Sequence, residues 1–268
     1  MPAIDTVGFF ATAGAASPFP TALAAAPGDS LSIRNFPAGQ SANLEALLYS
    51  AGGGERVRVV SPNLHDNQTG LTFEPAEIPA AFLIPGYIQV ALQANDTLTV
   101  QGGIAAAGTI CGALQIYYSQ LPGIQARLHS WGDISGNIRY VKSVEVDLAA
   151  IAVGAWTDTL ITQTENQLHA NKDYAVLGYQ CSAAIDVVGV KGSATGNLRV
   201  CGPGASTTLD ITEYFVYMSE QNNVPYIPVF NSDDRFAFYV SAFNHAAVAG
   251  AADHVYLILA ELITPVVP

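Results

Sequence analysis

The side chains that usually carry out catalysis are present in this chain, but their spacing forms no catalytic pattern. No Gly-x-Ser-x-Gly sequence offers a serine nucleophile on a strand-to-helix turn. Gly52–Gly54 and Gly102–Gly103 lack the Lys-Ser/Thr pair that a phosphate-binding loop requires. The histidines are dispersed, without the close pair that a metal enzyme on a jelly-roll scaffold uses: His65, His129, His169, His245 and His254. We therefore predict no enzyme activity, no catalytic residues and no cofactor.

Two groups of residues could bind an ion or form a covalent bond, and each has a simpler interpretation. Asp233 and Asp234 are adjacent carboxylates in an expected turn. They could share a calcium ion with nearby carbonyl oxygens, although solvation is the simpler interpretation. Cys111, Cys181 and Cys201 are an odd number of cysteines without metal-ligand spacing. Cys181 and Cys201 could pair on neighbouring strands, and both this disulfide and free thiols stay open.

The composition indicates a folded protein with an unusual surface. Half of the 268 residues are hydrophobic, 12% are charged, and the net charge is −12. So few charges leave the surface to uncharged polar residues or to contacts with other copies of the chain, and we favour the contacts. The ten Lys and Arg residues are scattered along the chain, so neither direct nucleic-acid binding nor docking on an anionic membrane is predicted.

The first 28 residues contain no Lys or Arg. The stretch Ala22-Leu23-Ala24 is similar to a signal-peptidase site, but the positive segment of a signal peptide is missing, because the first basic residue is Arg34. Several Pro and Gly residues would interrupt a membrane helix, and no transmembrane segment is predicted. We predict that residues 1–28 form an extended N-terminal arm that lies across a neighbouring subunit or domain.

From residue 29 onward, the sequence predicts short β-strands separated by turns. Four segments alternate between mainly apolar and polar side chains, as half-buried strands do. They are Ser30–Phe36, Asp96–Gln101, Ile138–Leu148 and Arg235–Ser241. Clusters of Gly and Pro lie between the strands, and no stretch of twelve or more residues has a convincing helical period. Many short strands with this punctuation indicate a sandwich or barrel.

The second half of the chain repeats the order of segments in the first half. At one common offset, Asp29-Ser30-Leu31 aligns with Asp158-Thr159-Leu160, and Ala46-Leu47-Leu48 aligns with Ala175-Val176-Leu177. Further stretches align in the same order: Arg58–Val60 with Val187–Gly189, Thr69–Thr72 with Thr195–Leu198, Pro85–Val90 with Val224–Val229, Asn95–Leu98 with Asp233–Phe236, and Ala113–Tyr118 with Val255–Leu259.

Each copy has a size that suits an eight-stranded jelly roll. We therefore predict an all-β fold of two tandem jelly-roll-like β-sandwiches, over residues 29–130 and 131–268, with the extended N-terminal arm before them. An immunoglobulin-like sandwich is the nearest alternative, but no Cys–Trp–Cys arrangement supports it. Trp131 and Trp156 lie near the expected junction, where a buried contact between the two domains would explain them.

The paired stretches that begin at Asp29 and Asp158, at Ala46 and Ala175, and that contain Tyr87 and Tyr226 resemble the architecture of the double jelly-roll major capsid proteins of icosahedral viruses. The resemblance implies a structural virion protein that self-assembles in the host cytoplasm. It also implies a homotrimer whose six jelly rolls form a pseudo-hexagonal tile, with other virion proteins as partners. The chain departs from larger family members in its short loops, which puts a receptor-binding role in doubt.

Candidate subunit-contact residues are aromatic side chains in the arm and in two expected strands, although each could equally be a core residue: Phe9, Phe10, Phe19, Tyr117, Tyr118 and Tyr256. Three other functions stay open: a virion spike or decoration protein, a secreted β-sandwich protein that binds carbohydrate or mediates adhesion, and an enzyme on a scaffold of two cupin-like domains. The dispersed histidines disfavour the enzyme.

Overall fold

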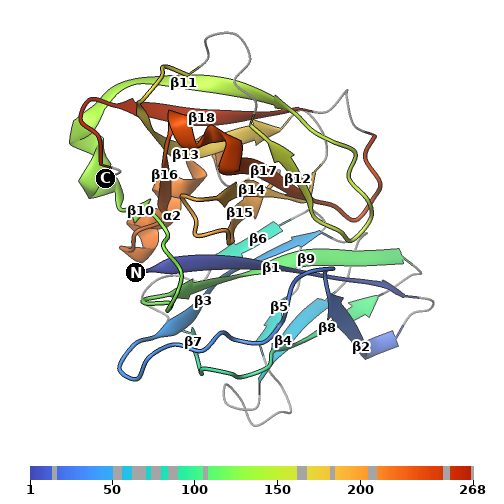
Figure 1. The fold of residues 1–268 in the computed structure, drawn as a ribbon. Helices are drawn as coiled ribbons and strands as arrows, with labels where there is room; N and C mark the ends of the chain where they lie inside the picture. The colour runs from blue at the N-terminus through green and yellow to red at the C-terminus, as the bar shows by residue number, and fades with distance from the viewer. Residues whose placement is uncertain are drawn as a thin grey trace.

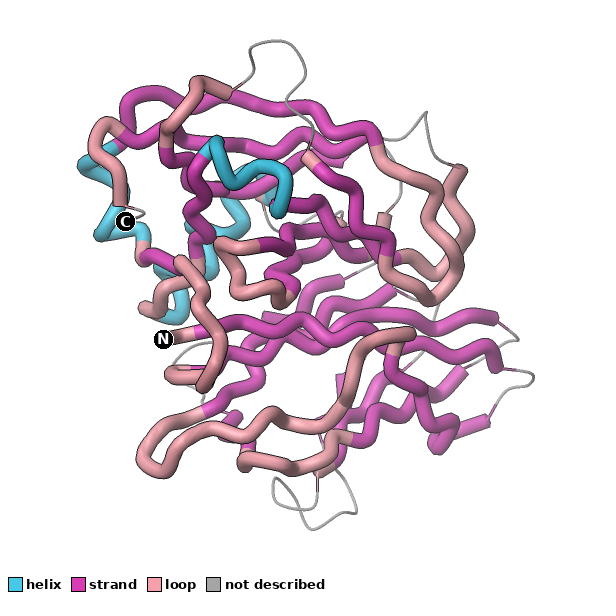
Figure 2. The backbone as a smooth tube through the Cα atoms, in the orientation of Figure 1, coloured by secondary structure: helices cyan, strands magenta, loops and turns pink. Residues whose placement is uncertain are grey.

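The computed structural model describes residues 1–13, 17–50, 56–61, 71–73, 80–83, 90–104, 108–161, 168–181, 185–204, 210–249 and 254–266. The predicted all-β class is confirmed, because antiparallel strands build every sheet of the described chain. All the described helical segments lie in the second half of the sequence (Figure 2). None of them is long and apolar enough to span a lipid bilayer.

The second half of the chain forms two sheets with the strand order of a jelly roll. Counting its eight main strands in chain order, one sheet has the strand order first, eighth, third, sixth, and the other has the order second, seventh, fourth, fifth. This order is two Greek keys folded together, which is the jelly-roll pattern. The strands are β11 (Ile138–Asp147), β12 (Thr157–Leu160), β13 (Asp173–Cys181), β14 (Val187–Gly192), β15 (Arg199–Pro203), β16 (Ile227–Asn231), β17 (Phe238–Phe243) and β18 (His254–Leu262). The short strand β10 (Leu128–His129) extends one sheet beyond β16.

The first half has the same strand order, with its two sheets joined into one curled sheet of nine strands. The joint is the pairing of Phe9 and Phe10 with Ala25 and Ala24. The strands follow the order β5-β4-β8-β2-β1-β9-β3-β6, and β7 pairs with β3, so that β6 and β7 together occupy the place of the sixth strand. These strands are β1 (Ala3–Ala13), β2 (Ser17–Ala25), β3 (Ala42–Ser50), β4 (Arg56–Val60), β5 (Leu71–Phe73), β6 (Ala80–Leu83), β7 (Val90–Leu92), β8 (Thr99–Ile104) and β9 (Gly108–Tyr118).

The internal repeat places equivalent segments on equivalent strands. Three aligned pairs lie on β3 and β13, on β4 and β14, and on β9 and β18. The third strand of each copy also carries a β-bulge, between Leu44 and Ala46 in β3 and between Val176 and Gly178 in β13. These bulges align Ala46 with Gly178 rather than with Ala175, so the alignment by sequence found the right strand in a shifted register. The pair at Asp29 is a weaker match, since Asp29 follows β2 whereas Asp158 lies inside β12.

The residues for which we predicted an extended N-terminal arm are instead two strands of the first sheet. β1 pairs with β9 along its whole length, and β2 pairs with β8. Side chains of β1 from Ala3 to Phe9 are buried on both faces of the strand, so the sequence shows no alternation there. A strand covered on both faces lacks the period of two that identifies a half-buried strand, which explains the correction.

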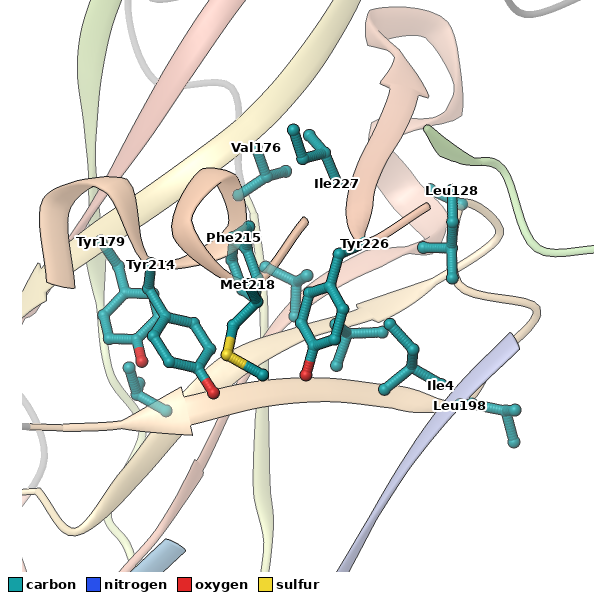
Figure 3. Packing of buried hydrophobic residues seen from close by; sticks show 14 of the residues in the cluster. Ile4, Leu128, Val176, Tyr179, Leu198, Tyr214, Phe215, Met218, Tyr226 and Ile227 are labelled. Carbon is teal, nitrogen blue, oxygen red and sulfur yellow. The ribbon is translucent and has the colours of Figure 1, made fainter. Parts of the chain in front are cut away.

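The two halves lie one above the other, with β1 and β9 of the first half facing the second (Figure 1). All named strands up to Tyr118 belong to the nine-stranded sheet, and all from Leu128 onward belong to the other two sheets. The domain boundaries at residues 28 and 130 stay predictions. The main buried apolar cluster runs through both halves. Figure 3 shows Ile4 of β1 together with Leu198, Tyr226 and three residues of α2 (Tyr214–Asn222), which are Tyr214, Phe215 and Met218.

Candidate functional site: the junction between two jelly rolls

An apolar cluster joins the two halves, and its first-half members are small. Phe243 at the end of β17 is fully buried, and its ring centroid lies 4.9 Å from that of Trp156. A Cβ atom at Gly8 would lie only 2.9 Å from Trp156 Nε1, so glycine is needed for this close approach. The buried members are Ala26, Ala46, Cys111 and Ala113 from the first half, and Val187, Cys201 and Phe243 from the second, with Phe10 and Trp156 packed beside them.

One guanidinium group links the halves electrostatically. Arg199 of β15 places Nη1 3.1 Å from Asp29 Oδ1 in the first half and Nη2 3.1 Å from Asp158 Oδ2 in the second. Its Cζ also lies 4.7 Å from the ring centroid of Trp156. The Arg199 side chain is only 15% exposed, so these contacts are little screened by solvent.

The two carboxylates that Arg199 contacts differ in their balance of burial and hydrogen bonding. Burial raises the pKa of Asp29 more than its hydrogen bonds from the Gly8 N–H and Trp156 Nε1 and its attraction to Arg199 lower it. At Asp158, burial also acts to raise the pKa, but hydrogen bonds from Ser241 and Lys191 and the attraction of Arg199 outweigh it. Arg199 is therefore the cation that both acids share, and Lys191, 3.0 Å from Asp158, is a second cation beside Asp158.

Side chains of the first half satisfy the free edge of β15. This strand ends the second sheet of the second half, so its outward backbone groups have no strand partner within that sheet. The Cys201 N–H donates to Thr6 Oγ1 at 3.2 Å, and Gln115 Nε2 donates to the Cys201 carbonyl oxygen. Tyr214 Oη in turn donates to Gln115 Oε1 at 3.2 Å. Covering an edge strand in this way fixes its position and removes a site for unwanted strand pairing.

A second buried carboxylate, Asp186, also connects the two halves. Cys111 Sγ of the first half donates to Asp186 Oδ2 at 3.2 Å, and the same oxygen accepts the His245 N–H at 2.6 Å. His245 Nδ1 lies 2.8 Å from Asp186 Oδ2, so the imidazole and the thiol both face the carboxylate. Burial raises the pKa of the Cys111 thiol, and Asp186 adds to the effect, so these surroundings favour the thiol over the thiolate.

The structure places the predicted contact residues mostly inside the chain. Phe9, Tyr117 and Tyr118 are buried, and Tyr118 Oη accepts a hydrogen bond from the Arg34 N–H, so they have little surface left for another subunit. Phe10 is half-buried beside the junction, and Tyr256 is half-buried with its ring against His254. The Phe19 side chain lies outside the described part of the structure. A contact between Phe10 or Tyr256 and another subunit stays a prediction.

The other sequence candidates lie away from the junction or act within the chain. Asp234 pairs with Arg127 at 2.8 Å, and Asp233 accepts a hydrogen bond from the Asn171 N–H. All three cysteines are free thiols, since β13 and β15, which carry Cys181 and Cys201, belong to different sheets. His65 lies outside the described residues. Trp156 lies at the expected junction, whereas the Trp131 N–H donates to Ser219 Oγ within the second half.

A polar hub that the sequence did not reveal surrounds Glu261 near the end of β18. Glu261 Oε2 accepts hydrogen bonds from Tyr174 Oη at 2.7 Å and Tyr140 Oη at 2.9 Å, and lies 2.7 Å from His169 Nδ1. Arg139 lies 3.3 Å from the other carboxylate oxygen. The Glu261 side chain is 0% exposed. These partners come from β11, β13 and the segment before β13, so the hub ties three parts of the second jelly roll together.

Two further features could hold a ligand on chemical grounds. Glu145, Asp147 and His254 lie close enough to share a cation, and both carboxylates are exposed. A pocket of about 610 Å³ lies among the first residues, the segment that connects the halves, and Val266. Arg127, its basic lining residue, is already paired with Asp234.

The fold and the junction define the class of the molecule: a protein of two jelly rolls of equal topology packed against each other. Neither a protein-family model nor a curated protein matches the chain. One solved structure that it matches is described as the crystal structure of the STIV MCP, with MCP standing for major capsid protein. The two are 9% identical over 98% of this chain and 88% of that chain, with a TM-score of 0.17.

Replacing Arg199 by methionine is expected to lower the free energy of unfolding by about 2–4 kcal/mol, because two half-buried or buried carboxylates lose their common cation. Urea denaturation of the full chain measures this. Arg34→Met is the matched control, since Arg34 pairs with Asp5 at 2.7 Å but is 48% exposed. The control is expected to lose less than about 1 kcal/mol, and equal losses in the two variants would contradict the role given to Arg199.

Proposed function

We propose that the chain is a structural virion protein, a capsid subunit that assembles with copies of itself into an icosahedral shell. The observation that carries the proposal is the double occurrence of one jelly-roll strand order in a single chain. This is the architecture that the sequence resemblance to double jelly-roll major capsid proteins implies. The resemblance further implies a trimer with six jelly rolls in a pseudo-hexagonal tile, formed in the host cytoplasm. The role is structural and not catalytic.

The junction supports the proposal physically. A tile requires that the two jelly rolls of a chain keep a fixed relative position, because every later contact depends on it. The shared apolar cluster, the Arg199 contacts and the covered edge of β15 restrain that position through side chains of both halves. Few charged groups are needed to hold the two jelly rolls of a chain together, since their contacts depend on complementary shape and on burial.

Within the described residues, few large apolar side chains are exposed and available for contacts between copies. Four such side chains are well exposed there: Met1 at 61%, Ile263 at 59%, Val141 at 52% and Val153 at 42%. The abundant hydrophobic residues instead fill a main core that extends through both halves and the smaller cluster at the junction. We therefore expect contacts between copies to be mainly polar and to depend on shape complementarity.

Analytical ultracentrifugation over a wide concentration range tests the proposal. A capsid subunit is expected to form a species of three times the 28.0 kDa chain mass, followed by much larger closed particles as the concentration rises. A discrete trimer or pentamer that never grows would favour the virion spike or decoration protein. A monomer at every concentration would contradict the proposal and favour the secreted adhesion protein, for which N-terminal sequencing of the mature protein is the direct test.

A further inference from the structure

A buried acidic residue with no basic partner lies on the first-half side of the junction. Glu45 is the extra residue of the β-bulge in β3, between Leu44 and Ala46. It is 6% exposed, and no basic side chain in the described part of the chain pairs with it. An isolated carboxylate in such a place is costly, because water no longer solvates the charge and no cation replaces the water.

The ionisable groups around Glu45 are hydroxyls and not cations. Its charge acts on Tyr117 of β9, on Tyr214 of α2 and on Tyr226 just before β16, raising the pKa of each phenol in addition to the larger effect of burial. β15, which also packs on β3, contributes the buried Cys201 thiol and Arg199, and Arg199 is engaged with Asp29 and Asp158. The neighbouring strands β6 and β7 contain no ionisable residue.

The backbone places Glu45 at the junction of the two jelly rolls, because the next residue, Ala46, belongs to the apolar cluster there and pairs with Gln115, which accepts a hydrogen bond from Tyr214. Tyr117 belongs to the first half, whereas Tyr214 and Tyr226 belong to the second and are fully buried in the cluster of Figure 3. Tyr226 Oη has no partner of acceptable hydrogen-bond geometry among the described residues. Burial without a neighbouring cation therefore favours the neutral form of the Glu45 carboxyl group.

We propose that Glu45 is a pH-sensitive contact of the junction, where the neutral carboxyl group permits close packing of the two jelly rolls and its ionisation loosens them. The inference concerns a single chain, so it holds whether or not the chain assembles. It adds to the proposed function a means by which a modest change of pH alters the stability of the building block.

The direction of the effect follows from the pKa of Glu45. Burial raises this pKa from 4.5 to about 7 in the folded chain. Between these two values, the folded protein keeps a proton that the unfolded chain has released. The contribution of Glu45 to the free energy of unfolding is therefore fully present below pH 4.5 and is lost as the pH rises through about 7. The unfolding equilibrium constant is expected to increase by a factor of the order of 100 across this window.

Urea denaturation of the full chain between pH 5 and pH 8.5 tests the inference, with Glu45→Gln as the variant. Glutamine has the shape of the neutral carboxyl group and does not titrate, so the variant is expected to lose most of the decrease in stability and to be more stable than the parent above pH 7. Glu220→Gln on the exposed side of α2 is the control and is expected to follow the parent chain. The inference is overturned if Glu45→Gln shows the same pH dependence as the control.

A second measurement covers the case in which the variant does not fold. Nuclear magnetic resonance of the parent chain with ¹³C-labelled glutamate carboxyl groups reports the titration of Glu45 directly. A midpoint near 7 is expected for one carboxyl resonance. The signals of Tyr214 and Tyr226 are expected to shift over the same pH range, because the charge of Glu45 acts on both side chains. A set of glutamate midpoints all at or below 4.5 would refute the inference.

Discussion

Phe243→Ala is expected to lower the free energy of unfolding by about 3–5 kcal/mol, because it removes a fully buried ring and leaves a cavity. The cavity would lie between the jelly rolls, since Phe243 packs on Trp156 of the second half and belongs to the cluster that includes Cys111 and Ala113 of the first half. Amide hydrogen exchange followed by mass spectrometry is therefore expected to show faster exchange in β1 and β9 as well as in β17.

Phe238→Ala is the matched control for this prediction. Phe238 is the same residue type on the same strand and is equally buried, but its ring stacks on Phe230 at 4.3 Å inside the second jelly roll. A similar loss of stability is expected, with increased exchange mainly in the second half. If β9 exchanges at the parent rate in Phe243→Ala, or accelerates equally in both variants, the junction does not couple the halves as described.

Glu261→Gln is expected to lower the free energy of unfolding by about 2–3 kcal/mol at pH 7, because the hub loses its charge while its donors remain. The carboxylate oxygen that now accepts from Tyr174 and Tyr140 and faces His169 would become part of an uncharged amide. Thermal or urea denaturation measures the loss. Glu145→Gln on β11 is the control, since Glu145 is exposed, and less than about 0.5 kcal/mol is expected there.

The pH dependence of the Glu261 contribution is opposite in sign to that of Glu45. Burial alone would raise the pKa of Glu261, but the hydrogen bonds from Tyr174, His169 and Tyr140 outweigh it and lower the pKa from 4.5 to about 2. The stabilisation is therefore present above pH 4.5 and is lost as the pH falls from 4.5 toward 2. The stability difference between the parent chain and Glu261→Gln is expected to shrink in that range, and a constant difference would contradict the assignment.

The fold class and the repeated order of segments could be predicted because they depend on local patterns. Period-two alternation identifies strands such as β11, and turn clusters separate them. The order of aligned segments then identifies two copies without any knowledge of which strands pair. β1 was missed because both of its faces are buried. The curled sheet of the first jelly roll covers one face, and the second jelly roll covers the other.

The residues of the junction could not be predicted, because their roles arise from contacts between distant positions. Arg199 is one of ten scattered basic residues in the sequence, and only folding brings Asp29 and Asp158 to it. The one available signal was an acidic residue inside an apolar strand, as with Glu45 in β3 and Glu261 in β18. A charge in such a place must be either paired or neutral when buried, and the two residues represent these two cases.

Cryo-electron microscopy of the purified, concentrated chain tests most directly whether two like jelly rolls form one building block that assembles. The expected particle is a trimer with six β-sandwich lobes in a pseudo-hexagonal ring, in which the two lobes of each chain meet at Arg199 and Phe243. A two-lobed particle that stays single at every concentration would contradict the assembly, and lobes in variable relative positions would contradict the junction.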